Sequence, residues 1–196
     1  MTSSRVLFIS NYYPPTSWGG IQLYTHGIAR ELQVRGHRVQ ILCVGEWSTG
    51  RQHLNRVVND EYEGVSVRRL DLNWSKAPRP FAYLSNNPVT AKETGRLIRE
   101  FRPDVVHVTS ASTLSGSVIF RAKQECIPVV VTLADFWFIC PRFTLRRADG
   151  HLCDADVPPH HCTRCLAWDA KIHRWSRRVL PERTVATLLS RAGKIG

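Results

Sequence analysis

The sequence has no apolar stretch long enough to cross a bilayer, which excludes a protein that spans a membrane through a hydrophobic helix. It also has no internal repeat, no low-complexity segment and no signal-peptide pattern at its first residues, so we expect the chain in the cytoplasm. It does have 196 residues with 43% hydrophobic content, which is enough for one globular domain with a sizeable core.

Acidic residues are scarce in this chain. It holds 16 Asp and Glu against 27 Lys and Arg, which gives a formal net charge of +11. Such a charge predicts anionic partners: nucleic acid, phosphorylated ligands or an anionic membrane face. Zinc-finger spacing, an aromatic RNA-binding signature and a helix-turn-helix are all lacking, so we expect no nucleic acid. Arginines become denser from Arg174 to Arg191, which favours an anionic membrane surface; an ordinary solvated basic surface is the alternative.

Short apolar runs alternate with segments of helical periodicity, the pattern of an α/β fold. The runs predict strands at residues 6–9, 39–44, 65–70, 105–108 and 129–133, and the periodic segments predict helices at residues 21–34, 87–101 and 114–125. Residues 46–60 are polar and predict a loop. Strands separated by helices imply a parallel sheet that helices cover on both faces.

Gly19 and Gly20 stand where the loop after the first predicted strand meets a helix. A helix N-terminus behind a glycine-rich loop can hold an anion with free backbone N–H groups. The alternative is a tight loop that only starts the helix. Ligands of open α/β sheets bind at the carboxyl ends of the strands, so we expect the site among residues 11–20, 44–47, 109–112 and 134–137.

Four of the six cysteines cluster in one short segment: Cys140, Cys153, Cys162 and Cys165. Two residues separate the last two, a spacing that lets a chain present two thiolates to one metal ion. We expect a structural zinc ion held by the four thiolates. A disulfide and free thiols are the alternatives, and a cytosolic location argues against a stable disulfide.

Several segments together resemble the N-terminal half of family 4 glycosyltransferases. They are Phe8–Pro15, Gly19–Gly20, Leu32–Val39, Pro103–Val108 and Asp135–Arg142. Residues 152–165 resemble those of a cysteine-bearing subset of that family. The resemblance implies the GT-B fold, with two facing Rossmann-like halves. This chain is similar to the first, acceptor-side half, so the resemblance implies a missing C-terminal domain as its partner.

The resemblance also implies a reaction. It is the transfer of a hexose from a nucleoside-diphosphate sugar to a glycan or lipid-linked acceptor, as in polysaccharide biosynthesis. Gly19 and Gly20 then face the diphosphate of the donor. The missing half would hold most of the nucleoside, so we expect this chain alone to be inactive. The alternative is a non-catalytic binding module or a truncated, inactive domain.

Asp135 and His107 are the candidate catalytic residues. A carboxylate at the cleft can orient an acceptor hydroxyl or act as a base, and an Asp can equally cap the following turn. His107 lies in an apolar strand, where a histidine is usually structural. Ala134 departs from the family pattern, which commonly has a histidine there, and alanine can neither hydrogen-bond through its side chain nor carry a proton.

These observations divide the chain into three predicted parts. Residues 1–139 form a Rossmann-like domain, residues 140–165 a Cys/His-rich loop, and residues 166–196 two C-terminal helices.

Overall fold

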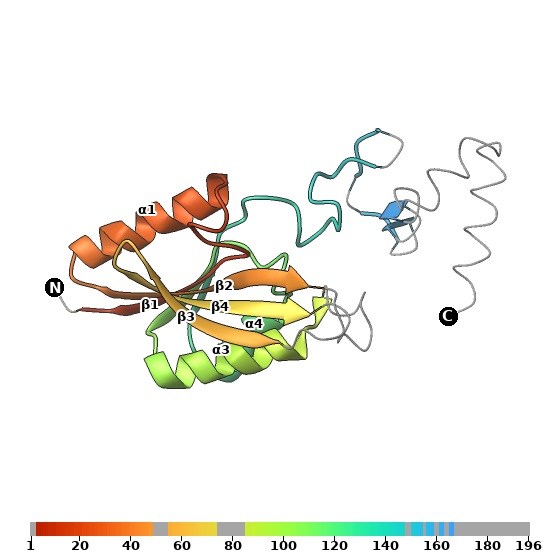
Figure 1. Ribbon diagram of the computed structural model, residues 1–196. Coiled ribbons are helices and arrows are strands. Elements are labelled where there is room, and N and C mark those ends of the chain that lie inside the picture. Colours follow the sequence, from red (N-terminus) through yellow and green to blue (C-terminus); the bar gives the residue numbers. More distant parts are fainter. Residues whose placement is uncertain are drawn as a thin grey trace. The chain divides into compact units, whose positions relative to one another are not determined.

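The computed structural model describes residues 3–48, 55–73, 85–147, 150–154, 156–158, 161–162 and 165–166 (Figure 1). The chain divides into two units, Met1–Ala134 and Asp135–Gly196. Most of the predicted C-terminal helical region, including the arginine-rich stretch from Arg174 to Arg191, lies outside the described residues.

The first unit is built on a six-stranded sheet with the order β3-β4-β2-β1-β5-β6. The strands are β1 (Arg5–Ile9), β2 (Arg38–Ser48), β3 (Arg56–Tyr62), β4 (Val65–Asn73), β5 (Val105–Val108) and β6 (Val129–Val131). All neighbouring strands are parallel except β3 and β4. β1 is central, since its Ile9 pairs with Leu42 of β2 and with Val108 of β5. The predicted α/β class with a Rossmann-like sheet is confirmed.

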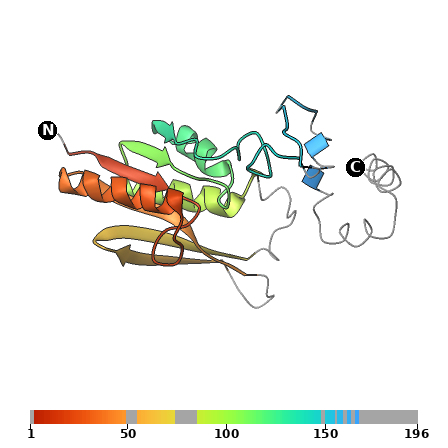
Figure 2. The same cartoon turned by 90° about the horizontal axis from the view of Figure 1, so that it is seen from above.

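Helices cover both faces of this sheet. They are α1 (Gly20–Val34), α3 (Pro88–Phe101) and α4 (Ser117–Gln124). Figure 1 shows α1 on one face and α3 with α4 on the other. Seen from above, the β3–β4 hairpin and α4 lie at opposite ends of the sheet (Figure 2). This arrangement follows from right-handed crossovers that leave β1 in opposite directions.

The start of α3 shows how local sequence sets a helix boundary. Pro88 stands at its first turn, where the missing N–H of proline costs nothing. The side chain of Asn87 accepts hydrogen bonds from the backbone N–H groups of Val89 and Thr90. These bonds satisfy two of the donors that every helix N-terminus leaves open.

Strand alternation sorts the core into two layers. Residues of the sheet that face α1 pack against its Ala29, and they include Val6, Phe8, Val39, Ile41, Val65 and Val67. Their neighbours Leu7, Leu42 and Leu70 are also buried and point to the opposite face, because successive side chains of a strand alternate. A strand that is buried on both faces reads as a continuous apolar run, which is why β1 was recognisable from sequence.

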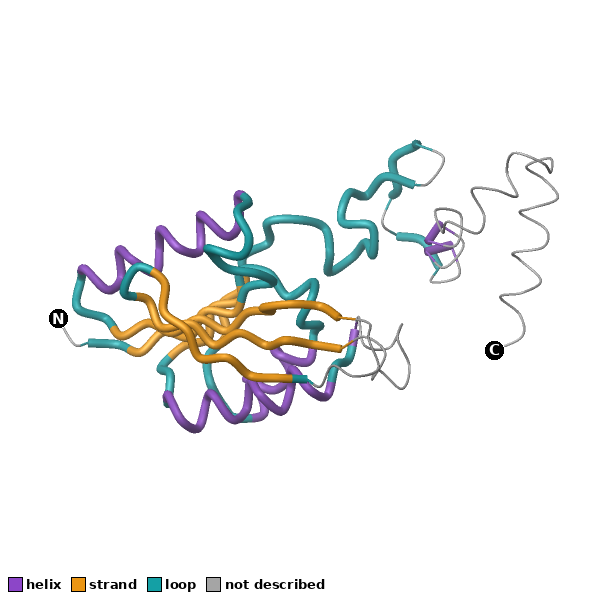
Figure 3. The backbone as a smooth tube through the Cα atoms, viewed as in Figure 1, coloured by secondary structure: helices purple, strands orange, loops and turns teal. Residues whose placement is uncertain are grey.

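The loop prediction for residues 46–60 was wrong in part. β2 continues to Ser48, and Arg56–Tyr62 form β3, the edge strand beside β4 (Figure 3). An edge strand keeps much of its surface in water, so its polar residues are tolerated. Two of them, Asn59 and Asp60, accept hydrogen bonds from arginines of β4.

The second unit consists of turns and short backbone contacts in its described part. The backbone N–H of Cys140 donates to the carbonyl of Phe136 at 2.7 Å, which closes one turn. Further along, Arg146 forms an isolated bridge with Leu152, and the N–H of Cys153 donates to the carbonyl of Leu145. Backbone bonding rather than an apolar core therefore organises this segment.

Candidate functional site

The loops that follow β1 and β5 are hydrogen-bonded to each other, and the loop after β1 is also bonded to β2. The carbonyl of Asn11, just after β1, accepts from the N–H of Val44 at 3.0 Å and from the hydroxyl of Thr113 at 3.1 Å. Its side-chain oxygen accepts from the amide of Gln22 at 2.9 Å and from the N–H of Tyr12 at 2.8 Å. Asn11 thus joins loops that are 102 residues apart, at the sheet edge where the sequence predicted a site.

Gly19 is the N-cap of α1, and its backbone is extended, with φ −152° and ψ 172°. No side chain of the described residues caps this helix, and its first turn contains no acidic residue. The first N–H groups of any α-helix have no partner within the helix, and the helix dipole adds positive potential there. The loop formed by residues 12–20, called the glycine loop below, therefore ends in a set of donors suited to an anion.

The two glycines differ in their surroundings. A Cβ on Gly19 would fall 2.5 Å from Oε1 of Gln22, whereas a Cβ on Gly20 would meet no atom of the described residues within 4 Å. Gly19 is required by the close approach of a buried neighbour, and Gly20 leaves open space at the helix N-terminus. The glycine pair is thus where the sequence predicted it, with the two residues in different roles.

Behind the glycine loop, α1 is attached to the sheet by buried hydroxyls. Oγ1 of Thr25 lies 2.8 Å from Oγ1 of Thr109, which follows β5, and 2.7 Å from the carbonyl of Ile21. Both threonines are almost fully buried. These contacts hold the N-terminal half of α1 above the ends of β1 and β5.

The sequence analysis missed a polar and aromatic cluster beside the glycine loop. The hydroxyl of Tyr13 lies 2.7 Å from Nδ1 of His26, whose Nε2 lies 3.0 Å from a carboxylate oxygen of Glu63. The ring of Tyr62 is packed against both Tyr13 and His26, and Trp18 lies edge-on to Tyr62. Burial raises the pKa of Tyr13, so this phenol stays neutral. No spacing motif links these residues, which come from a loop, a helix and a hairpin.

His107 has a structural partner in the first unit. Its ring lies 5.0 Å from that of Phe8, and its Nε2 lies 2.8 Å from the hydroxyl of Thr132. Burial lowers the pKa of His107, which favours the neutral imidazole. These contacts are those of a half-buried strand residue, and its predicted catalytic role stays a prediction.

Asp135 begins the second unit, so the division of the chain falls between it and Ala134. Its carboxylate accepts a hydrogen bond of 2.9 Å from the N–H of Trp137. This contact is the turn cap that the sequence offered as the alternative to a catalytic base. Ala134 is exposed at the end of the first unit.

All six cysteines are free thiols, so none of the four predicted zinc ligands forms a disulfide. Burial and the neighbouring Cys153, Cys140 and Cys165 raise the pKa of Cys162. Within the described ranges, however, no group of three or more His, Cys, Asp or Glu side chains is arranged to hold a metal ion, so the structure lends the zinc prediction no support.

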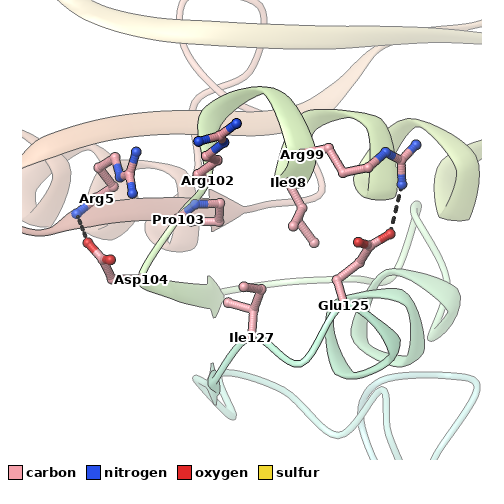
Figure 4. A pocket seen from close by; sticks show the side chains of 8 residues that line it. All are labelled: Arg5, Ile98, Arg99, Arg102, Pro103, Asp104, Glu125 and Ile127. Carbon is pink, nitrogen blue, oxygen red and sulfur yellow. Dashed lines mark hydrogen bonds and ion pairs between the residues drawn. The ribbon is translucent and has the colours of Figure 1, made fainter.

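One cavity lies away from the glycine loop, at the amino ends of the strands. Its volume is about 520 Å³, and its lining includes Arg5 at the start of β1, Asp104 before β5 and Ile127 before β6 (Figure 4). Figure 4 shows Asp104 bonded to the backbone N–H of Arg5, and Glu125 paired with Arg99. This edge is opposite to the one where open α/β sheets bind ligands.

Searched over its described residues, the chain shows no helix that is both long and apolar enough to cross a membrane.

Comparison with known proteins gives a family match. The model of the family described as "Glycosyl transferase 4-like domain" matches residues 19–193. A curated protein of Klebsiella pneumoniae, described as an uncharacterized 42.6 kDa protein in the cps region, is 24% identical over 155 residues. That alignment covers 72% of this chain and 39% of the relative, so the chain spans about two fifths of the length of the Klebsiella pneumoniae protein.

Two solved structures are similar at low identity. One is an alpha,alpha-trehalose-phosphate synthase (UDP-forming) from Burkholderia xenovorans in complex with glucose-6-phosphate: 15% identity, 65% of this chain, 33% of that chain and a TM-score of 0.46. The other is sucrose-phosphate synthase from Thermosynechococcus elongatus: 15% identity, 65% of this chain, 32% of that chain and the same TM-score of 0.46.

Proposed function

Since the chain belongs to the glycosyl transferase 4-like family, we propose that it supplies the glycine-loop half of an enzyme that transfers a hexose from a nucleoside-diphosphate sugar. The observation that carries this proposal is the N-terminus of α1, which starts at Gly20 and has no side-chain cap. The first N–H groups of this helix, which have no partner within the helix, are suited to the diphosphate of the donor. The proposed acceptor is a glycan or a lipid-linked acceptor.

In this proposal the glycine loop stabilises the leaving group. Transfer of the sugar leaves negative charge on the departing nucleoside diphosphate. Preorganised backbone donors stabilise such charge without having to reorient during the reaction. Asn11 and Gln22 support those donors, because their mutual hydrogen bond of 2.9 Å fixes the first turn of α1 to the sheet edge.

The proposal also includes a further domain, a residue that orients the acceptor, a membrane surface and a structural metal ion. A further domain binds most of the nucleoside, which accords with the chain spanning about two fifths of its curated relative. Asp135 is the candidate residue for orienting the acceptor hydroxyl. Because the chain has a net charge of +11, we propose that the protein binds to an anionic membrane surface. A structural zinc ion at Cys140, Cys153, Cys162 and Cys165 is proposed from their spacing in the sequence alone.

The decisive experiment places a negative charge where the diphosphate is proposed to bind. We compare Gly20→Asp with its neutral isostere Gly20→Asn in a protein that joins this chain to the proposed further domain. Neither side chain has a close neighbour at its Cβ, and an acidic residue in the first turn of a helix favours the fold by about 0.3–1 kcal/mol. Both variants should therefore stay folded.

Affinity is measured by calorimetric titration with a panel of nucleoside-diphosphate sugars, and transfer by release of the nucleoside diphosphate. Gly20→Asp should weaken donor binding by about tenfold or more relative to Gly20→Asn, since like charges repel in a partly desolvated site. Equal affinities in the two variants, or no donor binding by the unmodified protein, would overturn the proposal.

A further inference from the structure

One buried arginine, Arg69 of β4, is hydrogen-bonded to the backbone of the glycine loop. Its Nη1 donates to the carbonyl of Tyr13 at 3.0 Å, and its Nη2 donates to the carbonyl of Pro14 at 2.5 Å. Nη1 also lies 3.3 Å from the hydroxyl of Thr16. All three partners precede Gly19 within the same loop, although more than 50 residues separate them from Arg69 in sequence.

The other side of this guanidinium is fixed by the sheet. Its Nε donates to Oδ2 of Asp60 on β3 at 2.7 Å, and Nη1 lies 3.7 Å from Sγ of Cys43 on β2. The side chain of Arg69 is only 6% exposed. The guanidinium thus bridges three strands and the glycine loop.

A buried guanidinium is tolerated only when its donors are satisfied. Here the carbonyls of the glycine loop accept the hydrogen bonds of the guanidinium. Movement of the loop away from the sheet would leave a buried positive charge without acceptors, so Arg69 resists that movement. The phenol of Tyr13 adds a second attachment through His26, on the side of α1.

We propose that Arg69, oriented by Asp60, is a positioning residue for the glycine loop: it sets where the Gly19–Gly20 backbone lies at the N-terminus of α1. It acts through the carbonyls of Tyr13 and Pro14 and does not contact the donor. The inference rests on the proposed function for one point, that this loop holds the diphosphate. The mechanical part, the control of loop position by Arg69, stands independently of it.

Lysine cannot replace arginine in this place. The planar fork of a guanidinium addresses carbonyls and a carboxylate in different directions at once, whereas an ammonium is a point charge on a flexible stem. Arg69→Lys keeps the charge and removes the fork. It therefore tests geometry rather than net charge.

The neighbouring Arg68 provides a matched control. It is also buried, but strand alternation directs it to the opposite face, where it pairs with Glu100 of α3 at 2.8 Å and donates to Asn59 at 3.0 Å. Both of these partners lie outside the glycine loop. Arg68→Lys thus disturbs an equally buried arginine of the same strand on the other layer.

The test is amide hydrogen exchange of the full-length protein, resolved to peptides covering residues 12–23. Arg69→Lys should raise exchange in these peptides by about tenfold or more, while peptides from β1 and β5 keep their protection. Arg68→Lys should leave the loop peptides unchanged. Asp60→Asn is a milder change that weakens only the contact between Asp60 and Arg69. It should give a smaller increase in exchange of the loop peptides, and it replaces Arg69→Lys in the test if that variant does not fold.

A second readout separates this inference from the proposed function. With a donor that the unmodified protein turns over, Arg69→Lys should raise KM for the donor more than it lowers kcat. If the loop loosens but the unmodified protein binds no nucleoside-diphosphate sugar, the positioning role stands and the proposed function fails. Unchanged loop exchange in folded Arg69→Lys, or equal loosening in Arg68→Lys, would overturn the positioning role.

Discussion

Gly19 and Gln22 share a space that admits no additional atom: a Cβ on Gly19 would lie 2.5 Å from Oε1 of Gln22. Gln22 cannot easily yield, because its residue is 6% exposed and its amide donates to Asn11. The first turn of α1 is thereby locked to the loop after β1 through a side chain that passes beside a glycine.

Gly19→Ala should destabilise the protein by about 1–2 kcal/mol, since the added methyl displaces the amide of Gln22 from its buried hydrogen bond. Gly20→Ala is the control: its Cβ meets nothing, and alanine is up to about 1 kcal/mol better than glycine in a helix. Urea denaturation of both variants measures the difference. Equal midpoints would contradict the role assigned to Gln22.

Stability should fall in acid because three carboxylates are held ionised in the folded state. Arg69 lowers the pKa of Asp60, His26 lowers that of Glu63, and Arg68 lowers that of Glu100. A lowered folded pKa means that the contribution is present above the ordinary carboxyl pKa of about 4 and is lost as the pH falls through the folded value.

The measurement is the free energy of unfolding between about pH 5 and pH 3. Asp60→Asn and Glu100→Gln should each flatten the decline, because each removes one proton uptake that accompanies acid unfolding. Declines as steep as that of the unmodified protein would show that these ion pairs do not contribute.

His107 should contribute to the pH dependence at a higher pH. Burial lowers its pKa, so the unfolded state binds more protons near pH 6 and stability declines as the pH falls below about 6.5. His107→Gln should remove that decline and leave transfer largely intact, since the contacts of His107 are with Phe8 and Thr132. A folded variant with transfer reduced by a hundredfold or more would instead assign it a catalytic role.

The cysteine segment should bind one zinc ion per chain when purified without chelators. Cys140, Cys153, Cys162 and Cys165 are free thiols, and the two-residue spacing of the last two suits a metal ion. Elemental analysis together with thiol titration is the measurement. Cys165→Ser should lower the metal content, and Cys43→Ser is the control outside the segment. Negligible zinc with four titratable thiols in the native protein would rule the site out.

Much of the first unit could be predicted from the sequence because its signals are local. The run at Val6–Ile9 is buried on both faces, and Val106 and Val108 are buried in the run at Val105–Val108, so their hydrophobicity marks both segments as strands of the core. Asn87 and Pro88 define the start of α3 through contacts within three residues. The glycine pair could be predicted for the same reason, because the loop and the start of the helix are formed by consecutive residues.

Edge structure and long-range polar contacts could not be predicted in this way. The polar residues of β3 are typical of a loop unless β4 is beside them, because pairing rather than burial makes them a strand. The Tyr13–His26–Glu63 cluster likewise needs a loop, a helix and a hairpin to meet. No periodicity in the sequence reports such a meeting.

The sequence by itself predicted five strands of the sheet, the helices α1, α3 and α4 and the position of the glycine loop, since backbone propensity and burial act between near neighbours. The tertiary structure alone decided what holds that loop. Arg68 and Arg69 are adjacent and chemically identical, yet one pairs with α3 and the other supports the glycine loop. Strand alternation sends them to opposite faces, and the sheet order then determines which partners each can reach.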